Sequence, residues 1–178
     1  MSASAAGTGP AGGGGPDPLV ELCAFRVGGE EYVLDVRRVR EVVSPVEIRP
    51  VPRAPEFIEG VADLRGEIVP VVDVRKRLAL PAGPRTRKTR FLVVHLGRRM
   101  VALLVDAVLE VVRIPRSAIR PAAGLAKPDE PRLFLGVCGG PGSGGGRLKL
   151  LLNARALLEP HGPEEIAAAR ALMEKGRG

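Results

Sequence analysis

A chain of 178 residues can form one compact domain or two small ones, and a composition of 45% hydrophobic and 26% charged residues is typical of a folded protein. Aromatic residues make up only 3%, which argues against a surface that stacks nucleic-acid bases on aromatic rings. The net charge of +7 leaves a basic nucleic-acid-binding protein as an alternative. However, the arginines are dispersed among acidic residues, and only Arg85, Arg87, Lys88 and Arg90 form a cluster.

The first segment, residues 1–18, contains Gly, Ala, Ser and Pro with almost no apolar anchor, and we expect a flexible tail there. Its start has neither the basic nor the apolar region of a signal peptide, and no later stretch is long and apolar enough for a membrane helix. Cys23 and Cys138 lie in apolar runs, which predicts buried thiols in a reducing compartment. We therefore expect a cytoplasmic protein.

From Leu19 onward the chain alternates short apolar runs, rich in β-branched residues, with Gly or Pro at intervals of about ten residues. This pattern predicts an all-β fold. Gly28-Gly29 and Gly97-Arg98 each separate two such runs, and we predict a hairpin turn at both. The predicted strands are 22–27, 32–36, 68–72, 91–96, 101–105 and 148–152.

The last segment, residues 161–178, predicts one short amphipathic helix. Pro163 stands near its first turn, two glutamates follow, and apolar residues recur at helical spacing from Ile166 to Met173. The apolar face can pack on the β-structure or contact a partner, and the sequence leaves both roles open.

The chain contains an internal duplication. The segment from Gly28 to Val43 matches Gly97 to Val112 at an offset of 69 residues, and 66–75 matches 146–155 at an offset of 80. We place the two copies at about 25–80 and 94–160, and predict two packed β-barrels with a candidate site in the groove between them. The turn Asp63-Leu64-Arg65-Gly66 is peculiar to the first copy, because the second has a glycine-rich loop between Cys138 and Gly146.

Catalytic patterns are not evident. His95 lies within an apolar strand and His161 in a Pro-Gly segment, and neither has a nucleophile or metal-ligand partner at a recognisable spacing. The glycine-rich loop lacks the Gly-Lys-Ser/Thr of a phosphate-binding loop. We predict an interaction protein that is not an enzyme and uses no metal or cofactor.

The segments that carry a resemblance are Phe25–Val36, Val39–Val43 and Pro50–Arg75, the last containing Gly-Val-Ala-Asp-Leu-Arg-Gly-Glu-Ile-Val-Pro-Val-Val-Asp-Val-Arg. The second half of the chain ends its matching segment at Asn153-Ala154-Arg155. Together these segments make the chain strongly resemble the CheW family from about residue 20 to residue 160. The resemblance implies an all-β domain at 19–160 made of two SH3-like five-stranded barrels. It also implies an adaptor that couples the cytoplasmic tip of chemoreceptors to the regulatory domain of the histidine kinase CheA.

The resemblance also implies a partner-binding surface. It carries over to Val39, Glu41, Gly60 and Arg65, with Asp63 standing where the family usually has asparagine. Val39 is expected at the barrel surface. Counterparts in the second copy allow a purely structural role for three of these residues: Val108 for Val39, Glu110 for Glu41 and Gly136 for Gly60.

Arg65 has no counterpart in the second copy, which favours a partner contact. The alternative is an ion pair within its own unit, to Asp63 or Asp73. Two functional alternatives stay open beside the adaptor: a basic nucleic-acid-binding barrel, and an adaptor that scaffolds the kinase without binding receptors.

Overall fold

The structure is a computed structural model, and it describes residues 15–121, 132–140 and 146–159. The predicted helix at 161–178 and most of the predicted tail lie outside these ranges. The described chain is mostly β, with twelve strands in two six-stranded sheets and almost no helix. The strands are β1 (Leu19–Val27), β2 (Glu30–Asp35), β3 (Val39–Val43), β4 (Ile48–Arg49), β5 (Ile58–Leu64), β6 (Glu67–Asp73), β7 (Arg90–Leu96), β8 (Arg99–Val105), β9 (Ala107–Pro115), β10 (Arg120–Pro121), β11 (Phe134–Cys138) and β12 (Lys149–Leu152).

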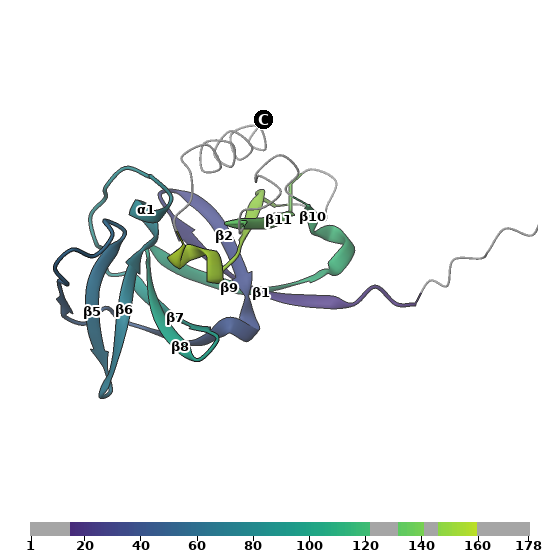
Figure 1. The fold of residues 1–178 in the computed structure, drawn as a ribbon. Coiled ribbons are helices and arrows are strands. Elements are labelled where there is room, and N and C mark those ends of the chain that lie inside the picture. The colour runs from purple at the N-terminus through teal and green to yellow at the C-terminus, as the bar shows by residue number, and fades with distance from the viewer. Residues whose placement is uncertain (1–14, 122–131, 141–145, 160–178) are drawn as a thin grey trace, which may run out of the picture.

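The two sheets repeat one strand order. One sheet runs β9-β1-β2-β12-β11-β10 and the other β3-β7-β8-β6-β5-β4, and each contains a single parallel pair, β2 with β12 and β8 with β6. In Figure 1 the strands β5 and β6 lie on one side of the molecule, with β7 and β8 beside them, while β10 and β11 lie on the other side and β2 lies between. The duplication in the sequence is thus a duplication of strand order.

The sheets and the sequence copies do not coincide. The β1–β2 hairpin, which begins the first copy, pairs with the strands of the second, while the β7–β8 hairpin pairs with β3 and β6 of the first. Each sheet also has six strands where five were expected. The short strands β4 and β10 complete the sheets by pairing with β5 and β11.

Both predicted hairpin turns are confirmed. Val27 pairs with Glu30, and both intervening glycines have positive φ (61° and 85°), as a type I′ turn requires. Leu96 pairs with Arg99 across the second turn, where Gly97 has a φ of 68°.

Side chains alternate strictly between the two faces of each hairpin strand, so each of these strands contributes to two different apolar clusters. In β7, Phe91 and Val93 point into a small cluster within their own sheet, whereas Leu92 and Val94 point into a large cluster shared by both sheets. In β1, Leu22 and Ala24 belong to a third cluster within the other sheet. Each sheet therefore encloses a core of its own, and the faces that remain pack against one another.

In the described residues the helical segments are short: α1 (Val74–Arg77), and the 3-10 turns η1 (Val36–Arg38), η2 (Arg116–Ala118) and η3 (Arg155–Leu158). No helix in the described residues is long and apolar enough to span a membrane. The Asp73 carboxylate caps α1 by accepting hydrogen bonds from the backbone N–H groups of Arg75 and Lys76. Asn153, its counterpart in the second copy, accepts from the Arg155 N–H, so the duplication extends to the cap.

Two arginines of α1 tie the sheets together. Arg77 is 4% exposed and donates hydrogen bonds to the backbone carbonyls of Ala156, Leu157 and Glu159. Arg75 holds Asp106 with two hydrogen bonds of 2.8 and 2.6 Å, and the same carboxylate accepts from the Gly28 N–H. Hydrogen bonds to charged groups thus add directional contacts to the shared apolar core.

Candidate functional site

The centre of the candidate site is the hairpin turn between β5 and β6. Leu64 pairs with Glu67, so Arg65 and Gly66 form a two-residue turn, with positive φ of 57° and 86° as in type I′. The Asp63 carboxylate accepts a 2.7 Å hydrogen bond from the Gly66 N–H. Asp63 therefore braces the turn through its backbone.

Arg65 is an unusual residue for this position. A type I′ turn favours Asn, Asp or Gly at its first central residue, and a side chain with a Cβ in the left-handed region costs about 1–2 kcal/mol. The Arg65 side chain is 80% exposed, and its guanidinium lies 3.1 Å from a carboxylate oxygen of Glu41. The ion-pair partner of Arg65 is thus Glu41, whereas the two expected intramolecular partners, Asp63 and Asp73, accept backbone N–H groups of their own segments.

The pair with Glu41 joins distant parts of the sheet. Glu41 lies on β3, at one edge of the strand order, whereas Arg65 lies on the β5–β6 turn near the other edge. Arg40 on β3 also reaches Glu67 on β6, at 3.6 Å. The sheet is therefore curved strongly enough to bring β3 against the β5–β6 hairpin, and the two ion pairs lie at this contact.

Val39 lies differently from the expectation of a surface residue. It is half-buried and packs against the large core shared by the two sheets. A β-bulge between Val39 and Glu41 changes the register with β7. The two residues are two apart in the chain, but they do not occupy equivalent places as they would in a regular strand. An aspartate at Val39 would therefore disturb the core as well as any partner contact.

Gly60 has a backbone role that the structure makes clear. The residue is buried on β5 at a bulge with a φ of 145°, and a Cβ there would lie 2.1 Å from the Arg49 carbonyl oxygen of β4. Gly136 is its counterpart in the other sheet, where a Cβ would meet the Arg120 carbonyl oxygen at 2.6 Å. Both glycines allow a short outer strand to approach closely.

The structure thus brings Glu41, Asp63 and Arg65 onto one surface, at the tip of the β5–β6 hairpin. Sequence reasoning missed the neighbours Arg40 and Glu67, which complete the ion-pair network. It also missed exposed apolar side chains on the same two elements, Val42 at 41% and Ile68 at 62% exposure. The available signal was the consecutive apolar pair Ile68-Val69, because alternation in a strand places one of the two on the solvent side. The surface is a charged patch with apolar neighbours, which suits protein–protein contact.

The other groups singled out in the sequence do not assemble a reaction centre in the described residues. No three His, Cys, Asp or Glu side chains there are close enough to hold a metal ion. Cys23 and Cys138 are buried free thiols, as predicted, and burial raises the pKa of each. In the basic cluster, Arg85 lies 3.7 Å from Glu59 and Arg90 donates to the carbonyls of Arg87 and Thr89.

Comparison with known proteins decides the family. The family model described as a CheW-like domain matches residues 21–160. The chain belongs to the CheW family of chemotaxis proteins. The "Chemotaxis protein CheW" of Rhizobium meliloti is 36% identical over 66% of this chain and 76% of its own length. Its namesake from Klebsiella aerogenes is 32% identical over 83% of this chain and 84% of its own length.

A solved structure agrees with this assignment. The crystal structure of the "scaffolding protein TtCheW" from Thermoanaerobacter tengcongensis matches with a TM-score of 0.69 and 30% identity, over 82% of this chain and 96% of that one. CheW proteins are non-catalytic adaptors, so this chain is a scaffolding or coupling protein of chemotaxis and not an enzyme, as the sequence predicted.

Asp63, at the first turn of the signature segment, has a clear structural role. The resemblance implies asparagine at this position, and Asp63 supplies the same kind of side-chain oxygen as an acceptor for the Gly66 N–H. The aspartate also places a negative charge in the same turn as Arg65.

Proposed function

We propose that this CheW protein couples the cytoplasmic tip of chemoreceptors to the regulatory domain of the kinase CheA, in the cytoplasm. We further propose that each sheet forms an SH3-like barrel. A separate small core within each sheet supports this, as does the contact of β3 with the β5–β6 hairpin. The partner-binding surface is proposed to comprise Glu41, Asp63 and Arg65, with Val39 and Gly60 acting mainly by shaping the barrel beneath it.

One observation carries the proposal of this surface. Arg65 occupies a strained turn position that asparagine or glycine would fill more stably, yet it exposes 80% of its side chain. An exposed ion pair with Glu41 contributes about 0–1 kcal/mol, which does not exceed the conformational cost. A binding role accounts for an arginine here, since a planar guanidinium makes paired hydrogen bonds to a carboxylate or to backbone carbonyls.

The test separates stability from binding at this one position. Arg65→Asn should keep or raise the melting temperature, because asparagine favours the turn, while weakening binding to a receptor cytoplasmic fragment or the CheA regulatory domain about tenfold or more. Arg65→Glu should weaken it further. Binding is measured by titration calorimetry with purified partners.

The matched control is Arg98→Glu, which reverses an exposed arginine in the β7–β8 turn of the same sheet. It should leave both affinities within about twofold of the parent protein. Equal losses for Arg65→Glu and Arg98→Glu would indicate a diffuse electrostatic effect and contradict the proposed surface. Binding to a nonspecific DNA duplex without binding to either protein would support the nucleic-acid alternative.

A further inference from the structure

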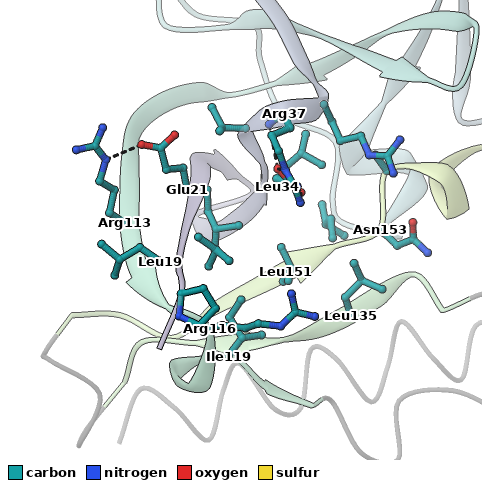
Figure 2. Close-up of a pocket in the computed structure, with 18 of the residues that line it drawn as sticks. Leu19, Glu21, Leu34, Arg37, Arg113, Arg116, Ile119, Leu135, Leu151 and Asn153 are labelled. Carbon is teal, nitrogen blue, oxygen red and sulfur yellow. Dashed lines mark hydrogen bonds and ion pairs between the residues drawn. The ribbon is translucent and has the colours of Figure 1, made fainter. Parts of the chain in front are cut away.

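A second surface lies on the other sheet, away from the β5–β6 hairpin. It is a pocket of about 890 Å³ between the start of β1, the β2–η1 junction, the end of β9, η2 and strands β11 and β12. Figure 2 shows Arg37, Arg113 and Arg116 around this pocket, with Leu151 between them. No residue of the proposed Glu41–Arg65 patch lines it.

The floor of this pocket is apolar, and its rim exposes large apolar side chains. Leu22 and Leu151 form part of the floor and belong to the small core of the sheet. Leu19 and Leu135 line the pocket yet are 65% and 48% exposed. Leucines that stand open at the mouth of a pocket with an apolar floor mark a surface that apolar side chains of a partner can cover.

The rim is positively charged. Four arginines line the pocket against two carboxylates, so the lining carries a net positive charge. Arg37 is engaged by Asp35 and Arg113 by Glu21, the second pair appearing as the dashed line in Figure 2. Arg38 and Arg116 also line the pocket, and neither makes an ion pair with a described residue, although the Arg38 charge also acts on the Asp35 carboxylate.

We propose that this pocket binds an acidic amphipathic segment of a partner protein, with its leucine-like side chains on the apolar floor and its carboxylates on Arg38 and Arg116. Charge complementarity selects this occupant. A second copy of this chain would bring a net charge of +7 toward a positive rim, which disfavours self-association there. The inference is independent of the proposed receptor and kinase contacts.

The probe is a synthetic amphipathic helix of about four turns, with leucine along one face and glutamate on the others, labelled for fluorescence anisotropy. The full-length protein should bind it, and binding should weaken as salt is raised. A peptide with the same leucines and lysine in place of glutamate should bind at least about tenfold more weakly.

Substitutions in the pocket test whether the peptide binds there. The double variant Arg38→Glu with Arg116→Glu should raise the Kd of the glutamate peptide at least about tenfold, and Leu135→Asp should raise it as well. The matched control is Arg87→Glu with Arg98→Glu, which makes the same change in net charge at exposed arginines outside the pocket. Circular dichroism confirms that each variant is folded, and Arg65→Glu should leave peptide affinity unchanged.

Three outcomes would overturn the proposal: no binding of the glutamate peptide, equal binding of the lysine peptide, or equal losses in the pocket and control double variants. Sedimentation that shows self-association abolished by Leu135→Asp would assign the pocket to a second copy instead. Binding to vesicles with anionic headgroups, lost in the pocket double variant while peptide binding is absent, would assign it to a membrane surface.

Discussion

Two glycines at equivalent places in the duplicated unit, Gly60 and Gly136, are each held against a backbone carbonyl of a two-residue strand. The repeat alone did not show whether Gly60 contacts a partner or serves the fold. The approach of the Arg49 carbonyl oxygen shows a role in the fold, since no side chain fits between the two strands.

A pair of alanine substitutions tests this role. Gly60→Ala should destabilise the protein by about 3 kcal/mol or more, because the new Cβ forces β4 away from β5 as well as straining the backbone. Gly29→Ala is the control, since Gly29 also has positive φ but its added Cβ would meet no atom within 4 Å, so it should cost only about 1–2 kcal/mol. Urea unfolding measures the free energy of unfolding of both variants. Equal losses of stability would show that the close approach of β4 to Gly60 does not add to the cost of the substitution.

At the scale of elements, the contact between β2 and β12 is where the first hairpin meets the strands of the second copy. Glu31 on β2 binds Lys149 of β12 and Arg26 of β1, each at 3.3 Å, and its side chain is only 13% exposed. Burial by itself would raise the pKa of Glu31, but hydrogen bonds and charge from Lys149 and Arg26 outweigh it and lower the pKa. The ionised carboxylate therefore stabilises the junction between the two copies.

This lowered pKa predicts an acid-dependent loss of stability. A group whose pKa is lower in the folded state contributes fully above its unfolded pKa, about 4.3 for glutamate, and the contribution is lost as pH falls through the folded value. Glu31→Gln should therefore lower the free energy of unfolding by about 1–3 kcal/mol at pH 7. The difference from the parent protein should shrink as pH falls below about 4.

The measurement is urea unfolding at a series of pH values. Glu47→Gln is the control, because Glu47 is exposed and makes no ion pair with a described residue. It should leave the pH dependence of the parent protein unchanged. A constant difference between Glu31→Gln and the parent protein at every pH would contradict the assignment.

At the scale of the whole molecule, the two halves of the chain exchange their first hairpins. The β1–β2 hairpin completes the sheet of β9 to β12, and the β7–β8 hairpin completes the sheet of β3 to β6. The largest apolar cluster draws on both sheets, and Arg77 of the first half is buried against carbonyls of the second. Neither half contains a complete sheet, so the molecule should unfold as one unit.

Splitting the chain tests this dependence. Residues 1–83 and 84–178, divided in the exposed segment between α1 and β7, should each fail to fold alone and should form the native β-structure when mixed. Circular dichroism and thermal unfolding follow the recovery. The control is the intact chain carrying a protease site in the same segment, which should stay folded after cleavage. Cooperative unfolding of either isolated half would show that the exchanged hairpins are dispensable.

The sequence by itself determined the β-class, both glycine turns, the duplication and the CheW family, because these depend on local spacing of apolar, glycine and signature residues. It also placed Glu41, Asp63 and Arg65 in one candidate surface. It could not pair Arg65 with Glu41, because the two residues meet only when the sheet curls and brings β3 to the far hairpin.

Only the tertiary structure decided the burial of Val39 and the exchange of hairpins. Val39 follows the same alternating pattern as a surface valine, and its packing against the shared core depends on where the second sheet lies. The exchange of hairpins also cannot be predicted from local sequence. The two copies have matching strand patterns, so each hairpin could pair with the strands of either copy. Strand pairing is a contact between residues far apart in the chain, so its choice is made by the connections and the packing of the whole molecule.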